Sequence, residues 1–144
     1  MIYPLDLRIL LDTCILVFLV RGNADGEIVE QRYSLSQRKG KLYISSISLG
    51  EILAFAKRNH WQGEKCRRLY QLLEQVQILS AGDEDVVGLY ANLKVESDYR
   101  GYNTGQNDLW IAATAQAAGA ILLTADNDFH WMQEEFLDII HYVR

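Results

Sequence analysis

Cysteine and proline are scarce in this chain, whose 144 residues include two cysteines, Cys14 and Cys66, and one proline, Pro4. Two cysteines cannot build a disulfide framework, and neither lies in a CxxC or Cys/His spacing typical of redox or zinc sites. We therefore expect both to be reduced residues that pack in the protein. The lack of Ser-, Gly- or charge-rich stretches leaves no linker, and we expect a single domain over residues 1–144.

Long apolar runs are also lacking. The strongest candidate, residues 9–20, follows Arg8 and superficially resembles a signal peptide, but the carboxylate of Asp12 interrupts it. A membrane-spanning helix would need about 18 or more apolar residues in succession. We therefore expect a soluble, cytoplasmic protein that does not contact a membrane.

Positive charge is in deficit, because 14 Lys and Arg residues stand against 19 Asp and Glu residues and the net charge is −5. Nucleic-acid-binding proteins usually carry a basic surface, so this composition alone argues against that class. Acids gathered around divalent cations would change the conclusion, because the cations invert the local field and attract phosphate oxygens. Basic residues cluster at 38–41, 57–58 and 65–68, and we interpret these clusters as solvated helix faces or loops.

Four acidic residues share one kind of position, since each lies at or just beyond the end of an apolar run. They are Asp12, Glu51, Asp108 and Asp126. A carboxylate at the boundary between a buried element and solvent is costly to desolvate alone, so several that converge on one point imply a shared cation. The pattern predicts a metal site.

Two of these acids also have an explanation that involves no metal. Glu51 lies three residues after Ser48, which is the spacing of a capping box at the start of a helix. Asp108 would lie in the first turn of a helix, where a negative charge interacts favourably with the helix dipole. We prefer the metal site. If each acid had its own separate explanation, it would be a coincidence that all four point to the same rim of the fold, whereas one shared site explains this directly.

Strand and helix patterns alternate along the chain, which predicts an α/β fold with a parallel sheet and helices on both faces. Strands are expected at residues 7–11, 42–44, 120–123 and 137–142, and helices after Asp12, over 27–37, after Ser45, over 63–79, over 83–99, and from Asn107 or Asp108 to Gly119. Residues 22–26 and 97–105 are expected to be loops. The stripe of Leu69, Leu72, Leu73 and Val76 is predicted to be core. Sites in such sheets form beyond the carboxyl ends of the strands near a topological switch point, where Asp12 and Asp126 would lie.

Four segments resemble the PIN domain family. They are LLDT at residues 10–13, SSISLGEI at 45–52, NDLWIAATA at 107–115 and LLTADNDF at 122–129. In size and spacing the chain is similar, more narrowly, to the VapC toxins of bacterial toxin–antitoxin pairs. The resemblance implies an α/β/α sandwich with a mostly parallel central sheet flanked by helices.

The resemblance also assigns roles to particular residues. The acidic quartet of the family corresponds to Asp12, Glu51, Asp108 and Asp126, as metal ligands and catalytic groups. Supporting roles correspond to Thr13, Asn107, Thr124 and Asp128. Many relatives carry Asn two positions after the first Asp, whereas this chain has Cys14, so the polar support of that position differs.

An all-carboxylate site suits Mg²⁺ or Mn²⁺, and such a cation can activate water and neutralise charge on a phosphodiester. The resemblance implies endonucleolytic hydrolysis of RNA, with tRNA and rRNA among the candidate substrates. It also implies a homodimer and a small VapB-like antitoxin that occludes the site. Exposed aromatic residues such as Trp61 and Trp131 could serve those contacts, although we expect both to be buried in the core.

Three alternatives are weighed against this function. A phosphatase of the haloacid dehalogenase type needs a second Asp at position 14, where this chain has Cys14. A glycosidase would use two carboxylates without a metal. The main alternative is a PIN-like scaffold that binds RNA or a protein partner without cleavage. His130 could take part in acid–base chemistry, but we expect it to be a surface residue.

Overall fold

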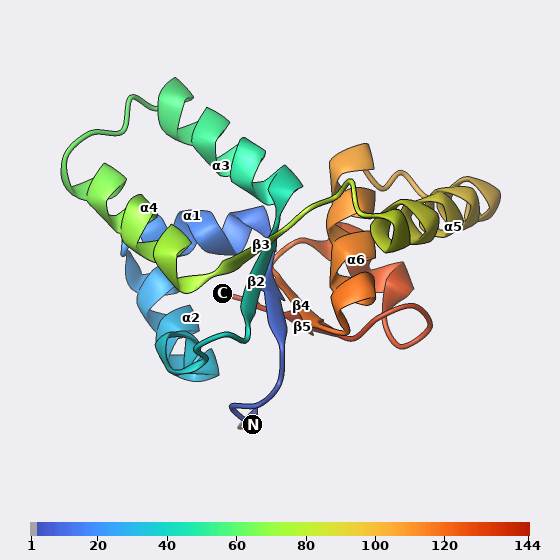
Figure 1. The fold of residues 1–144 in the computed structure, drawn as a ribbon, viewed down its shortest axis with the longest axis horizontal. Coiled ribbons are helices and arrows are strands. Elements are labelled where there is room, and N and C mark those ends of the chain that lie inside the picture. Colours follow the sequence, from blue (N-terminus) through green and yellow to red (C-terminus); the bar gives the residue numbers. More distant parts are fainter. Residues whose placement is uncertain (1–2) are drawn as a thin grey trace.

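The computed structural model describes residues 3–144, in which five strands form one parallel sheet (Figure 1). The strands lie in the order β3-β2-β1-β4-β5, and each neighbouring pair is parallel. Their bounds are β1 Ile9–Leu11, β2 Leu42–Ser45, β3 Gln77–Leu79, β4 Ile121–Thr124 and β5 Ile139–His141. The predicted α/β/α arrangement around a parallel sheet is confirmed.

Helices cover both faces of this sheet (Figure 1). They are α1 Thr13–Arg21, α2 Ala24–Tyr33, α3 Ser46–Arg58, α4 Glu64–Gln75, α5 Glu84–Arg100 and α6 Gln106–Ala118. Two short 3-10 helices complete the described elements, η1 Leu35–Gln37 and η2 Asn127–Met132. The helices α1, α2 and α4 pack on one face of the sheet and α5 and α6 on the other, while α3 packs on α1.

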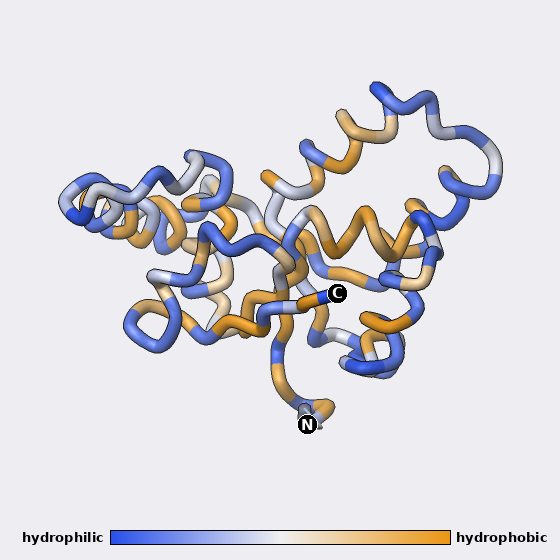
Figure 2. Tube along the Cα trace, turned by 180° about the vertical axis from the view of Figure 1, so that it is seen from behind, coloured by the Kyte–Doolittle hydropathy of each residue, from blue (hydrophilic) through white to orange (hydrophobic). Residues whose placement is uncertain are grey.

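The strands are apolar on both sides because both faces of the sheet are covered. In β1, Ile9 and Leu11 belong to the core shared with α1, α2 and α4, whereas Leu10 belongs to the core shared with α5 and α6. The neighbouring strand β4 repeats the pattern, with Leu123 on the first side and Leu122 on the second. Figure 2 shows the hydrophobic strands in the interior and hydrophilic loops at the periphery. Alternation of side chains across the sheet thus divides one apolar run between two cores.

One predicted helix extends too far at its C-terminal end. The helix expected over residues 63–79 ends at Gln75, and Gln77–Leu79 forms the edge strand β3, which pairs with β2. An edge strand that is largely exposed carries no buried apolar run. Its residues were therefore assigned to the preceding helix, because nothing in the pattern separated the two. The predicted apolar stripe is nevertheless core, because Leu69 and Val76 are buried and Leu72 and Leu73 pack against the same cluster.

The second helix begins earlier and ends sooner than predicted. Asn23 caps α2, since its Oδ1 accepts a hydrogen bond from the backbone N–H of Gly26 over 3.1 Å, so the expected loop over 22–26 is shorter. The helix ends at Tyr33 because Ser34 adopts a left-handed conformation with φ 52°. Residues 35–37 then form η1 instead of a continuation of the helix.

Arg38 also departs from the expected solvated cluster. Its side chain is 1% exposed, and its guanidinium donates hydrogen bonds to the backbone carbonyls of Tyr3, Pro4 and Tyr33. The hydrogen bonds of this one side chain therefore connect the start of the described chain to the end of α2.

Three further expectations concern packing and membrane contact. Trp61 is buried against Phe55, as expected, whereas Trp131 is only partly buried. Both cysteines are free and pack against the core. Within residues 3–144 the helices lack the length and apolar character that a membrane span requires.

Candidate metal centre

Two of the predicted acids follow neighbouring strands at the centre of the sheet. Asp12 comes directly after β1, and Asp126 comes two residues after β4. These strands are adjacent and parallel, and they lie where the strand order changes direction. A crevice forms at such a switch point because the following segments leave the sheet toward opposite faces. The predicted position of Asp12 and Asp126 is confirmed.

Asp12 is held by three groups in the interior. The backbone N–H of Thr13 donates to Oδ1 over 2.8 Å, the hydroxyl of Thr124 donates to Oδ2 over 2.7 Å, and the thiol of Cys14 lies 3.5 Å from Oδ2. Asp12 also caps α1. Burial raises the pKa of Asp12 although these donors oppose the change, and the charge of Asp126 raises it further.

Glu51 lies in the second turn of α3 and does not belong to a capping box. Ser45 caps this helix instead of Ser48, because its Oγ accepts a hydrogen bond from a backbone N–H of the first turn over 3.1 Å. Oε1 of Glu51 accepts a hydrogen bond from the hydroxyl of Thr13 over 2.7 Å, and Oε2 accepts one from the side-chain amide of Asn107 over 3.3 Å. The capping-box explanation of Glu51 is therefore wrong, and its carboxylate accepts hydrogen bonds from the first turns of α1 and α6.

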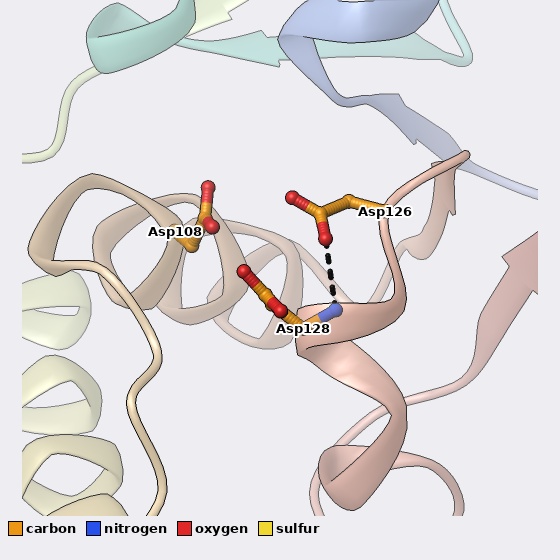
Figure 3. A group of neighbouring side chains, drawn as sticks. All are labelled: Asp108, Asp126 and Asp128. Carbon is orange, nitrogen blue, oxygen red and sulfur yellow. Dashed lines mark hydrogen bonds between the residues drawn. The ribbon is translucent and has the colours of Figure 1, made fainter.

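Asp108, Asp126 and Asp128 form a compact acidic group (Figure 3). One carboxylate oxygen from each lies within 4.8 Å of the others. Asp108 projects from the first turn of α6, while Asp126 caps η2 and Asp128 lies in its first turn. Oδ1 of Asp126 accepts a hydrogen bond from the backbone N–H of Asp128 over 2.9 Å, which fixes the spacing of these two acids.

Negative charge accumulates at this rim without a basic partner. The pKa of Asp108 is raised to about 7, first by burial and then by the charges of Asp12, Asp126, Glu51 and Asp128. None of the ion pairs within residues 3–144 includes any of these five acids. Partial protonation or a bound cation is needed to relieve the repulsion.

The ligand atoms fit a hard divalent cation. The compact group offers carboxylate oxygens alone, which Mg²⁺ and Mn²⁺ prefer, and histidine takes no part in it. The nearest thiol, that of Cys14, has its pKa raised to about 12 by burial and by the charge of Asp12, so it stays protonated at neutral pH. A protonated thiol is a poor zinc ligand, and the site therefore favours magnesium or manganese over zinc.

The predicted site residues meet at this rim in different roles. Asp108, Asp126 and Asp128 form the compact group, which thus includes an acid predicted in a supporting role. Asp12 and Glu51 lie outside that group and are held by the predicted supporting residues. Thr124 holds Asp12, and Thr13 and Asn107 hold Glu51.

Ser48 belongs to the same network and was not predicted. Its side chain is fully buried, and its Oγ lies 3.0 Å from the hydroxyl of Thr13. The sequence did contain a signal, because Ser48 and Glu51 lie one helical turn apart on one face. The capping-box interpretation assigned that spacing to the helix end instead of to the rim.

Comparison with known proteins agrees with this geometry. The PIN domain profile matches residues 9–134, which contain all five acids and both strands at the switch point. The chain belongs to the PIN domain family.

Among relatives of this PIN protein are two ribonucleases of Haemophilus influenzae. Ribonuclease VapC1 of strain R2866 is 30% identical over 119 residues, which are 80% of this chain and 84% of the relative. Ribonuclease VapC2 of strain ATCC 51907 is 26% identical over 118 residues, which are 82% of this chain and 86% of the relative. The similarity thus extends over most of each protein.

Solved structures of PIN proteins superpose along most of the chain. VapBC2 from Rickettsia felis, bound to a promoter DNA fragment, matches with a TM-score of 0.80 and 22% identity over 95% of this chain and 100% of the other. VapBC-1 from nontypeable Haemophilus influenzae matches with a TM-score of 0.72 and 25% identity over 94% and 98%. A toxin–antitoxin complex from Klebsiella pneumoniae matches with a TM-score of 0.64 and 26% identity over 83% and 88%.

Proposed function

We propose that this PIN protein is an endoribonuclease that depends on Mg²⁺ or Mn²⁺ and acts as the toxin of a VapBC-type pair. The observation that carries the proposal is the convergence of five carboxylates at the switch point with no basic partner among the described residues. A site with this much negative charge is suited to bind cations. Because the protein is acidic, bound cations would be needed to attract a phosphodiester. Relatives named ribonuclease support RNA as the substrate.

In this proposal Asp12, Asp108 and Asp126 hold the cation, and Asp128 adds a fourth carboxylate. When bound there, the cation would lower the pKa of the attacking water and neutralise charge that develops on the phosphate oxygens. Asp12 needs little reorganisation, because hydrogen bonds from Thr124 and from the backbone already fix its oxygens. A bound cation would favour the ionised form of Asp108, because it would offset the burial and the neighbouring negative charges that raise the pKa of this residue.

Glu51 acts as a further ligand or orients the attacking water. Both of its oxygens are already held, one by the hydroxyl of Thr13 and the other by the amide of Asn107. A carboxylate fixed from two helices keeps its direction toward the rim, which general-base and water-orienting roles both require.

The proposed partners follow from the same relatives. Structures of related toxins are described as complexes of VapB with VapC, which supports a VapB-like antitoxin that covers the acidic rim. We also propose a homodimer in the cytoplasm, with tRNA or rRNA as the substrate. Free cysteines are compatible with a reducing compartment.

The experiment that tests this function is cleavage of a mixed RNA pool that includes tRNAs. Purified wild-type and Asp12→Asn proteins are compared with Mg²⁺, with Mn²⁺ and with EDTA. We expect cutting that requires the metal and falls by at least about 100-fold in the variant, because the amide keeps the shape of Asp12 but loses its charge.

The other outcomes are equally informative. Equal cutting by both proteins would mean that the acidic rim is not the active site or that a contaminant cuts the RNA. RNA binding without turnover in either metal would support the non-cleaving scaffold instead. Circular dichroism of both proteins controls for folding of the variant.

A further inference from the structure

A pocket of about 210 Å³ lies directly beside the acidic group and has no role in the chemistry described above. Asp128 belongs to both, since it lines the pocket and contributes an oxygen to the acidic group. The remaining lining residues come from the loop between α5 and α6 and from η2. They are Tyr102, Asn103, Thr104, Asn127, His130 and Trp131.

Two aromatic rings form an assembled wall of this pocket. The rings of Tyr102 and Trp131 are stacked with their centroids 5.1 Å apart and an angle of 11° between their planes. Trp131 is held in place, because its Nε1 donates to the hydroxyl of Thr104 over 2.8 Å and its ring packs against that of Phe136 in a T-shaped arrangement. Tyr102 is 45% exposed. A further planar group can therefore pack on these rings without ordering them first.

Side chains that can form hydrogen bonds with the edge of a nucleobase line the same space. Asn103 and Asn127 are exposed, and a side-chain amide offers one acceptor and two donors in a plane, as the edges of nucleobases do. His130 is exposed as expected, and its Nε2 lies 3.2 Å from Oδ1 of Asn127. No Lys or Arg lines the pocket, and Asp128 repels anions, so a phosphate is disfavoured there.

The pocket keeps a fixed position relative to the acids. The hydroxyl of Thr104 lies 3.4 Å from the backbone carbonyl oxygen of Asp128, which ties the α5–α6 loop to η2. A group bound in the pocket therefore lies at a constant distance from a phosphate at the acidic group. A nucleobase and the neighbouring phosphate of one RNA chain are joined by the sugar, so they would need two sites held at such a fixed separation.

We propose that this pocket binds a nucleobase of the RNA next to the scissile phosphate, so that Tyr102 and Trp131 set a base preference at one position of the substrate. The inference rests on the proposed ribonuclease function. Its physical basis is that single-stranded bases are recognised by stacking on aromatic side chains and by hydrogen bonds to their edges. The exposed tyrosine supplies the stacking surface, and the amides supply the edge contacts.

The test compares Tyr102→Ala with Tyr99→Ala, a matched control on the last turn of α5. Tyr99 is 89% exposed and lies outside the pocket, so both variants remove an exposed tyrosine ring from one region. The proteins cut an RNA pool of randomised sequence, the cut ends are sequenced, and KM and kcat are measured on one preferred oligoribonucleotide. Tyr102→Phe, which keeps the ring, is included as a conservative variant.

For Tyr102→Ala we expect KM to rise roughly 5- to 100-fold, as for the loss of one base–aromatic stack, with a smaller change in kcat. The base preference at one position beside the cut should flatten, while Tyr99→Ala and Tyr102→Phe should keep the wild-type pattern. Unchanged KM and unchanged preference in Tyr102→Ala would overturn the base pocket while leaving the nuclease intact.

Failure of the proposed nuclease has a different signature, since the wild type would then cut nothing. In that case binding of a fluorescein-labelled oligoribonucleotide of randomised sequence is measured by anisotropy. Weaker binding by Tyr102→Ala alone would support the base pocket. Equal binding by all the proteins, or no binding, would overturn it, and an occupant such as a partner's side chain would then be the better explanation.

Discussion

At the scale of single residues, Thr124 controls how the two acids at the switch point are presented. Its hydroxyl donates to Oδ2 of Asp12 over 2.7 Å and accepts a hydrogen bond from the backbone N–H of Asp126 over 3.0 Å. The side chain is fully buried. One hydroxyl group therefore links the acids that follow β1 and β4.

Replacing Thr124 with Val should weaken the proposed metal site without changing the fold. The two side chains have the same shape, but Val leaves Oδ2 of Asp12 and the N–H of Asp126 without this partner. We expect Mn²⁺ to bind about 10- to 100-fold more weakly and stability to fall by about 1–3 kcal/mol. Titration calorimetry and urea unfolding would measure the two effects.

The conservative variant Thr124→Ser is the control for this prediction, because it keeps the hydroxyl group. It should retain most of the metal affinity, with a small loss of stability from the missing methyl group. Wild-type Mn²⁺ affinity in Thr124→Val would show that Asp12 does not depend on this hydrogen bond.

At the scale of elements, the close approach of α2 to α1 depends on Gly26. A Cβ at this position would lie 2.3 Å from the backbone carbonyl oxygen of Phe18 in α1. A backbone atom cannot move aside as the end of a flexible side chain can, so any side chain here must separate the helices. The separation would reach the site, because Asp12 is the N-cap of α1.

We expect Gly26→Ala to destabilise the protein by about 1–3 kcal/mol through this steric overlap. Gly88→Ala is the matched control, because Gly88 also lies within a helix, α5, and a Cβ there meets nothing within 4 Å. The control should be stabilised by about 0.5–1 kcal/mol, since Ala is the better helix former. Thermal unfolding of both variants checks the prediction, and similar melting temperatures would contradict it.

The sequence pattern predicted the central strands of the sheet but not the edge strand β3. The central strands β1 and β4 are largely buried and mostly apolar, and they were predicted, whereas the edge strand β3 was not. A central strand can be recognised in the sequence, because burial on both faces requires a continuous apolar run. An edge strand such as Gln77–Leu79 is defined by hydrogen bonds to its neighbour, which are not encoded in the periodicity of the chain.

At the scale of the whole molecule, the acidic rim makes stability depend on pH and on cations. The pKa of Asp108 is about 7 in the folded protein against an ordinary value of 3.8, so between these values the folded state binds more protons than the unfolded chain. Stability must then fall as pH rises through this interval and level off above it. The raised pKa of Asp12 acts in the same direction.

We therefore expect the metal-free protein to lose part of its stability as the pH is raised from about 4 to about 7 through the titration of Asp108. Mn²⁺ should restore stability, and by more at pH 8 than at pH 5, because it binds the ionised carboxylates. At a concentration 100 times its dissociation constant the gain is about 2.7 kcal/mol. Melting curves with and without Mn²⁺ at both pH values measure this effect.

Asp108→Asn is the control for the pH prediction, because the amide does not titrate. Its melting temperature should vary less with pH over this interval, and Mn²⁺ should stabilise it less. A wild-type response of the variant to both pH and Mn²⁺ would mean that Asp108 is not the group that couples stability to charge at the rim.

The sequence alone predicted the fold class and the acids Asp12, Asp108 and Asp126 at the rim, and it favoured Glu51 there over a capping role. Apolar runs that end in Asp12 and Asp126 indicate buried parallel strands, and the carboxyl ends of such strands lie on one edge of the sheet. Asp108 was placed at the same rim from its expected position in the first turn of a helix. These features are local, because they depend on periodicity and on the residue that follows it.

Tertiary structure alone decided the rest of the site. Glu51 could be a capping residue or part of the rim until its oxygens were found to accept hydrogen bonds from Thr13 and Asn107, which lie 38 and 56 residues away. The place of Asp128 in the compact group and the pocket beside it likewise arise where η2 meets the α5–α6 loop. Contacts between segments far apart in the chain leave no period in the sequence, so only the folded molecule can show them.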